Sequence, residues 1–218
     1  MLIGDGIAVV LTLGIAAFFA FPATRGLYLT ANAHVPELMS FAKFAILATG
    51  GEVLAWRLKN NNYVLKGFGI LPKTILWGFF GIIIYWAFTI FANGAPKVFP
   101  FLVNIAEPYK NILTAFTISL FLNLIFSPIF MTIHHISDTF ITDNLGTLPI
   151  RKFNMLAALN RIDWNRMWGF VYTKTIPFFW IPAHTLTFML PSEYRMIFAA
   201  GLSVVLGLIL GSVNKKRT

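Results

Sequence analysis

The sequence predicts an all-α protein, a polytopic transmembrane helical bundle of about six segments. Of its 218 residues, 57% are hydrophobic and only 11% are charged, and the mean hydropathy is +0.74. Soluble domains carry roughly 25% charged residues, so this chain has too few to cover a surface that faces water. Its apolar runs also reach about 20 residues, the length that spans a bilayer. These observations disfavour a soluble all-α protein with an unusually large core.

Six apolar stretches divide the chain into predicted spans. Loop-forming Asn, Pro and Gly residues separate them. The longest and most polar connection is 134–166, and its part at 150–159 fits a short amphipathic interfacial helix. We predict one membrane domain over 1–218, in which residues 1–38 add a helix and a loop to a core at 40–211. The predicted spans are 3–22, 39–57, 68–92, 111–133, 167–190 and 194–213.

Lys and Arg residues predict the orientation of these spans. Six crossings would place ten cations on one side of the membrane and four on the other. Because cytoplasmic loops carry an excess of Lys and Arg, we expect both chain ends and the polar loop to face the cytoplasm or an equivalent compartment. The larger group is Arg57, Lys59, Lys66, Arg151, Lys152, Arg161, Arg166, Lys215, Lys216 and Arg217, and the smaller is Arg25, Lys97, Lys110 and Arg195.

The net charge of +9 fits this bias together with anionic lipid headgroups as partners. No basic stripe interleaved with stacking aromatics is visible, so we expect no nucleic-acid partner. At the N-terminus, Asp5 stands where a signal peptide carries basic residues, which favours a retained first helix over a cleaved leader. Gly207 and Gly211 form a GxxxG pattern that permits close helix contact, and a homo-oligomer is one interpretation of it.

The sequence gives no sign of enzyme chemistry or of a cofactor. There is no cysteine, which rules out thiolate metal sites and Cys nucleophiles. No nucleophile elbow and no phosphate-binding Gly loop is present. His134, His135 and Asp138 lie close together, but four histidines in the whole chain are too few for a multi-histidine metal centre. We expect end-of-helix hydrogen bonding there and no metal site.

Four polar residues fall within predicted spans and are the candidate pore-lining residues. They are Glu52, Asn123, Lys174 and His184. A charge at the bilayer centre costs about 2.5–3.5 kcal/mol on insertion scales, so such groups usually turn inward, pair or line water. We expect these four to face a shared polar interior. For Lys174, escape of the long side chain to the headgroups is an equal alternative.

Lys43 and Lys73 also fall in predicted spans, and for them we expect that the ammonium groups reach the headgroups. Pro177 and Pro182 lie in the same apolar run as Lys174 and predict a kinked helix. Each proline removes a backbone donor, and the freed carbonyls need hydroxyls, water or neighbouring helices as partners. Such a kink can either line a cavity or only shape helix packing.

Residues 180–195, WIPAHTLTFMLPSEYR, resemble the C-terminal signature of the Mpv17-like family of peroxisomal and mitochondrial membrane proteins. His184 stands where that family usually has Gln, and Thr187 stands where it has Asn. Weaker matches follow the family's order along the chain, in GEVLAW at 51–56, GFFGIIIYW at 78–86, LNLIFSPIF at 122–130 and DWNRMW at 163–168. The residues that carry the motifs are Gly51, Pro128, Trp180, Phe188, Pro191 and Arg195.

The resemblance implies a non-enzymatic membrane protein that acts as a weakly selective channel for small solutes or metabolites. It implies an organellar membrane, whereas the lack of eukaryotic targeting features also suits a bacterial plasma membrane. The alternative is a non-conducting scaffold or assembly factor that works through the 134–166 loop. Lipids and small solutes are the partners expected from the first interpretation.

Overall fold

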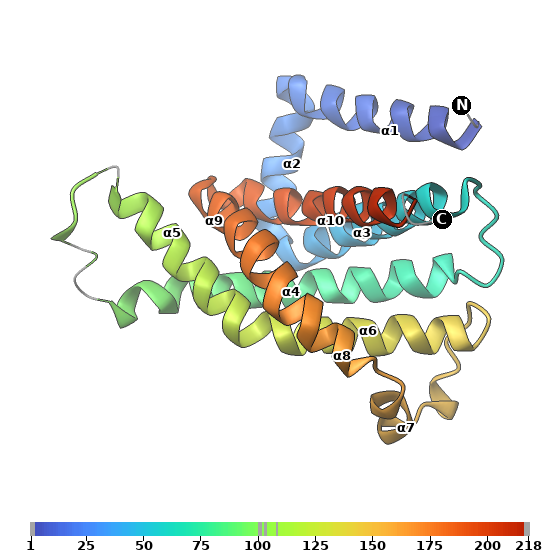
Figure 1. The fold of residues 1–218 in the computed structure, drawn as a ribbon. Helices are drawn as coiled ribbons and strands as arrows, with labels where there is room; N and C mark the ends of the chain where they lie inside the picture. The colour runs from blue at the N-terminus through green and yellow to red at the C-terminus, as the bar shows by residue number, and fades with distance from the viewer. Residues whose placement is uncertain (1–2, 100–101, 103, 108, 216–218) are drawn as a thin grey trace.

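The computed structural model describes residues 3–99, 102, 104–107 and 109–215, and every regular element in that part of the chain is a helix (Figure 1). The predicted all-α membrane bundle is therefore confirmed as a fold class. The elements are α1 (Ile3–Ala20), α2 (Pro22–His34), α3 (Pro36–Asn60), α4 (Ile70–Val98), α5 (Tyr109–Phe121), η2 (Leu122–Phe126), α6 (Ser127–Asp143), η3 (Ile150–Lys152), α7 (Met155–Asn160), α8 (Trp164–Arg166), η4 (Met167–Trp180), α9 (Ile181–Met189) and α10 (Ser192–Lys215).

Within the described residues, four helical stretches are long and apolar enough to cross a membrane. A fifth is added if α1 and α2, which meet at 86°, form one broken span. The expected six segments are thus corrected to four or five. The predicted span at 167–190 is in neither count, and the one at 3–22 is counted only together with α2. The four spans are Pro36–Asn60, Ile70–Val98, Tyr109–Asp143 and Ser192–Ile209.

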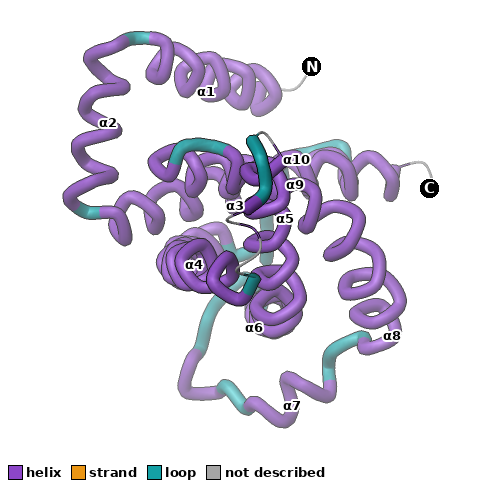
Figure 2. Tube along the Cα trace, turned by 90° about the vertical axis from the view of Figure 1, so that its left-hand side faces the viewer, coloured by secondary structure: helices purple, strands orange, loops and turns teal. Residues whose placement is uncertain are grey.

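Prolines set the corners at the N-terminal end. Pro22 and Pro36 occupy the first turns of α2 and α3, where a missing N–H costs nothing. The backbone turns sharply before each, and α1 and α2 therefore stand outside the group formed by α3, α4, α6 and α10 (Figure 2). The start of α1 is tied back to the end of α3, because Arg57 donates two 3.0 Å hydrogen bonds to the Asp5 carboxylate.

The start of α1 and the end of α10 lie at the same end of the structure (Figure 1). The loops after α3 and α6 lie there too. Lys216 and Arg217 fall outside the described residues, and the compartment that this end faces stays a prediction. In the predicted polar loop, α6 continues to Asp143, and α7 falls within the stretch expected to be an interfacial helix.

Two stretches of π-helix accompany the prolines in the middle of the chain. One is η2, just before Pro128, and the other is η4, which contains Pro177. Wider π turns often occur where the α-helical hydrogen-bond ladder is interrupted. Threonine hydroxyls donate hydrogen bonds to backbone carbonyls in η4, as Thr173 does to the Trp168 carbonyl at 2.7 Å. Pro182 follows in the first turn of α9.

Glycines let the spans approach closely. A Cβ on Gly51 would lie 2.9 Å from the Ser203 carbonyl oxygen, and one on Gly207 would lie 2.6 Å from the Gly51 carbonyl oxygen. Both distances are shorter than real Cβ contacts, so α3 and α10 meet backbone to backbone at these two glycines. Gly207, half of the GxxxG pattern, is therefore used for a contact inside the chain.

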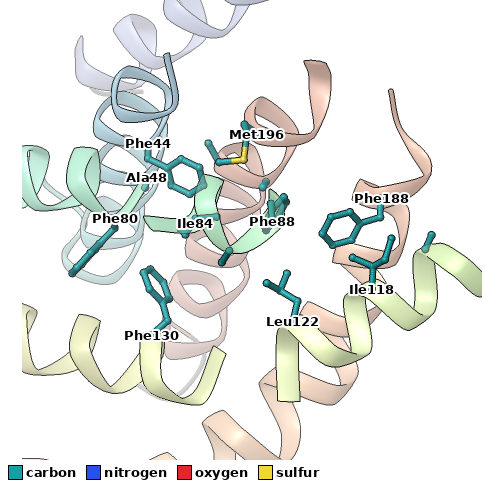
Figure 3. Close-up of a cluster of buried hydrophobic side chains, with 14 of the residues drawn as sticks. Phe44, Ala48, Phe80, Ile84, Phe88, Ile118, Leu122, Phe130, Phe188 and Met196 are labelled. Atoms are coloured by element: carbon teal, nitrogen blue, oxygen red, sulfur yellow. The ribbon is translucent and has the colours of Figure 1, made fainter. Parts of the chain in front are cut away.

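Aromatic side chains fill much of the space between the spans (Figure 3). Phe44, Phe80 and Phe130 come from α3, α4 and α6, and Phe88 meets Phe188 of α9 with ring centroids 4.8 Å apart. Met196 of α10 joins the same cluster. The core thus links four spans with α9.

Replacing Gly51 with Ala should lower the free energy of unfolding by about 1–3 kcal/mol, because the added methyl group overpacks the α3–α10 contact. The matched control is Gly50→Ala, since a methyl group there meets nothing within 4 Å. That control should be neutral or stabilising by up to about 1 kcal/mol. Denaturant unfolding in detergent micelles measures both variants, and equal effects at the two positions would contradict this packing.

Candidate functional site

A cavity of about 250 Å³ lies between the spans. It is bordered by α3, α4, η2, α6, η4, α9 and α10, and its walls are mostly aromatic and aliphatic. Polar side chains also reach it, among them Glu52, Ser127, His134, His184 and Ser203. Figure 3 shows six of the apolar lining residues, namely Phe44, Ala48, Ile84, Phe88, Leu122 and Phe130.

At one wall, Glu52 of α3 anchors a polar cluster that joins three spans. Its Oε2 accepts a 2.8 Å hydrogen bond from Lys73 of α4, and its Oε1 accepts one of 2.8 Å from the Trp77 indole. His134 of α6 lies 3.3 Å from the same Oε1. Lys73 also donates to Asp138 of α6. We call these five residues the Glu52 cluster.

The expectation that Lys73 reaches the headgroups is wrong. Its side chain is buried, with 7% of the residue exposed, and the ammonium group lies 4.3 Å from the centroid of Phe68. Two carboxylates on other helices compensate the loss of hydration that burial imposes. Their shared partner is the Lys73 ammonium. In the part of the chain that the structure describes, no three His, Asp or Glu side chains form a metal site.

Lys43 is buried as well, so the same expectation is wrong for it. Its ammonium group donates to the Asn32 side chain of α2 and lies 4.9 Å from the centroid of the Tyr28 ring. Tyr28 in turn donates to the Glu193 carbonyl at 2.6 Å. The α2 helix therefore supplies partners that stand in for headgroups.

A second polar group, on η2 and its neighbours, surrounds Asn123, which is fully buried. The Asn123 Nδ2 donates to the Ser119 carbonyl at 2.8 Å, and Ser127 donates to Asn123 Oδ1 at 3.0 Å. His184 of α9 lies 3.0 Å from Asn123 through its Nδ1. Ser119 links the group to the start of α9 by donating to the Ile181 carbonyl at 2.7 Å. We call Ser119, Asn123, Ser127 and His184 the Asn123 group.

The four candidate pore-lining residues are therefore not all in one place. Glu52 and His184 border the cavity, and Asn123 lies directly behind His184. Lys174 is exposed on η4 and is not among the lining residues, which agrees with the alternative of escape to the headgroups. Pro177 and Pro182 flank Trp180, whose ring forms part of the wall.

Sequence reasoning missed the partners of Glu52. His134 and Asp138 were expected to make hydrogen bonds at a helix end, yet they reach across to α3 and α4. Their spacing of four residues on α6 places both on one helix face. An acid and an imidazole on one face of a span, with an unpaired Lys in another span, are the signal that points to the cluster.

The residues that carry the family resemblance have packing roles. Gly51 makes the contact with α10, and Pro128 opens α6 after the π turn. Arg195 donates to the carbonyls of Leu190 and Phe188, at 2.9 and 3.1 Å, and so caps the end of α9. The remaining three are Phe188 and Trp180, which belong to buried clusters, and Pro191, which lies between α9 and α10.

Comparison of the chain with protein-family models, curated proteins and solved structures found no match. The resemblance to the Mpv17-like family stays a prediction from its motifs.

Replacing Lys73 with Met should lower the free energy of unfolding by about 3 kcal/mol, because it leaves the carboxylates of Glu52 and Asp138 near each other without their cation. Lys43→Met is the matched control, since Lys43 is equally buried but has Asn32 as its polar partner. We expect a clearly smaller loss there. Adding Glu52→Gln to Lys73→Met should restore part of the stability, and no recovery would argue against the pairing.

Proposed function

We propose that this multi-pass membrane protein provides a weakly selective passage for small solutes, and that the cavity between its spans is the chamber of that passage. The single observation that carries the proposal is the cavity itself, about 250 Å³ of space with Glu52, His134 and His184 at its wall. An engineered apolar cavity of about 150 Å³ already binds benzene, so this volume admits a small organic molecule. The Mpv17-like resemblance supports the same function.

The walls indicate which solutes would pass. A hydrated ion loses its water against aromatic and aliphatic walls, and hydrophobic constrictions close to ions by dewetting. Lys174, the one lysine among the candidate pore-lining residues, is exposed and is not among the residues that line the cavity. The charges of Glu52 and Lys73 neutralise each other. Small uncharged solutes therefore fit the chamber better than ions do.

The membrane and the orientation are part of the proposal. A bacterial plasma membrane or an organellar membrane would house the chain, with the end that carries the loops after α3 and α6 facing the cytoplasm. Lys66 in the loop after α3, and Arg151, Lys152 and Arg161 in the connection after α6, support that orientation.

A non-conducting scaffold is the second candidate, and the surface near α7 favours it. Leu145, Ile150 and Leu156 are 83%, 74% and 69% exposed beside the cations Arg151 and Lys152. Such a surface can dock a partner protein or the headgroup region. A folded protein that passes no solute would favour this candidate.

Replacing Ala48 with Leu should reduce solute flux several-fold, because Ala48 is buried at the cavity wall and the larger side chain takes up part of the chamber. The measurement is the rate of glycerol entry into proteoliposomes, followed by light scattering. Ala17→Leu, at an exposed position on α1, is the matched control and should pass glycerol as the wild type does. Planar bilayers should show little ion current.

Glycerol entry no faster than into protein-free liposomes, with the protein folded, would contradict the proposed passage. Equal flux through Ala48→Leu and the wild type would place the passage elsewhere in the molecule.

A further inference from the structure

The His184 ring is held in one orientation at the cavity wall. The Trp180 ring stacks on it with centroids 5.2 Å apart, and the Phe88 ring meets it edge-on at 5.4 Å. The third contact is with Asn123, through Nδ1 of the imidazole. With one face stacked on Trp180 and one nitrogen engaged, the position of the ring proton decides what His184 offers to the cavity.

The neighbours of Asn123 fix the orientation of its amide. A backbone carbonyl only accepts hydrogen bonds, so the amide atom 2.8 Å from the Ser119 carbonyl must be the NH₂ group. The Ser119 hydroxyl proton is already directed to the Ile181 carbonyl, and its oxygen lies 3.2 Å from the same NH₂ nitrogen. The two Ser119 oxygens then share one of the two NH₂ protons, which leaves the other proton for His184. The Ser127 hydroxyl donates to the opposite atom, Oδ1. All of these contacts agree on one orientation.

This orientation assigns the tautomer of His184. The atom of Asn123 closest to Nδ1 is the NH₂ nitrogen, at 3.0 Å, whereas Oδ1 lies at 3.3 Å. An NH₂ group donates, so Nδ1 accepts and carries no proton. In a neutral imidazole the proton then resides on Nε2. We assign His184 as the Nε2–H tautomer.

The Nε2–H donor opens onto the cavity. Among the described residues, both hydrogen-bond contacts of the ring use Nδ1, which leaves Nε2 without a partner. Four side-chain polar atoms of the described residues are fully covered by protein and lack a hydrogen-bond partner, and they belong to Ser40, Thr49, Trp56 and Trp180. His184 Nε2 is not among these covered atoms. It is therefore reachable by a water-sized molecule. Because His184 is otherwise buried and borders the cavity, the reachable space is the cavity.

At the other polar wall, both carboxylate oxygens of Glu52 are already engaged. Of the two Glu52 carboxylate oxygens, Oε1 faces Trp77 and His134, and Oε2 faces Lys73. A charged solute would meet a carboxylate whose oxygens are already engaged on one side and apolar rings on the other. An uncharged solute that carries an acceptor oxygen would meet an unused donor.

We propose that the cavity binds a small, uncharged, mainly apolar molecule with an acceptor oxygen, such as a ketone or ether, and that His184 Nε2–H recognises that oxygen. The proposal rests on the proposed function, in which solutes occupy this cavity, and adds the chemical class of the solute. His184 is then a specificity-determining residue, and the Asn123 group positions it.

The test compares two probes of similar shape, acetophenone and ethylbenzene, which differ in the acceptor oxygen. Their dissociation constants are measured with the full chain in detergent micelles by ligand-observed NMR. The readout is the ratio of the two constants in each variant, because micelle partitioning is the same for every variant and cancels.

His184→Asn retains an acceptor for the Asn123 NH₂ group but lacks a donor at the position of Nε2. It should weaken acetophenone binding relative to ethylbenzene by roughly 2- to 10-fold, the value of one hydrogen bond. His184→Gln places an amide NH₂ near the position of Nε2 and should restore part of the preference. Thermal unfolding of both variants checks that they are folded.

An unchanged ratio in folded His184→Asn would overturn the role of His184. In that case, ethylbenzene binding that is lost in Ala48→Leu would still support a cavity that takes up solutes. If neither probe binds to the wild type, the proposal on solute class is overturned, and glycerol flux then decides separately whether the passage itself stands.

Discussion

The backbone contact between α3 and α10 at Gly51 and Gly207 fixes the rest of the bundle. It brings the two helices together at one point, which orients the next residue, Glu52, toward α4 and α6. Glu52 then joins both helices through Lys73 and His134. The aromatic core closes around these contacts but leaves a cavity of about 250 Å³ beside them.

Burial of the Lys and Asn side chains in the spans follows one physical constraint. Hydrocarbon offers no hydrogen bonds, so each polar side chain inside a span needs a partner from the protein. Lys73 pairs with two carboxylates, those of Glu52 and Asp138, and Lys43 donates to Asn32. Asn123 is hydrogen-bonded to Ser119 and Ser127 and contacts His184. The donor of His184 that opens onto the cavity departs from this pattern, which is why it bears on function.

The sequence predicted the parts of this structure that depend on local composition. Low charge and long apolar runs indicated a helical membrane protein, and the cost of burial indicated that Glu52, Asn123 and His184 face inward. The partner of each lysine could not be predicted, because Asp138 is 65 residues from Lys73 and their contact depends on how α4 meets α6. The number of spans was overestimated, since apolar character alone does not separate the kinked stretch at 167–190 from a regular span. The cavity depends on how Phe44, Phe88 and Phe130 pack, which no local pattern encodes.

The most direct test of the account is whether small uncharged molecules reach the cavity in the folded protein. The chain has no cysteine, so Ser203→Cys places a single thiol at the cavity wall. N-ethylmaleimide, which is small and uncharged, should modify this thiol in proteoliposomes, while a quaternary-ammonium thiosulfonate should react far more slowly. Ser119→Cys, at a sealed position behind the wall, should resist both reagents. A Ser203→Cys thiol that reacts with neither reagent, or equally fast with both, would contradict a cavity that admits uncharged solutes.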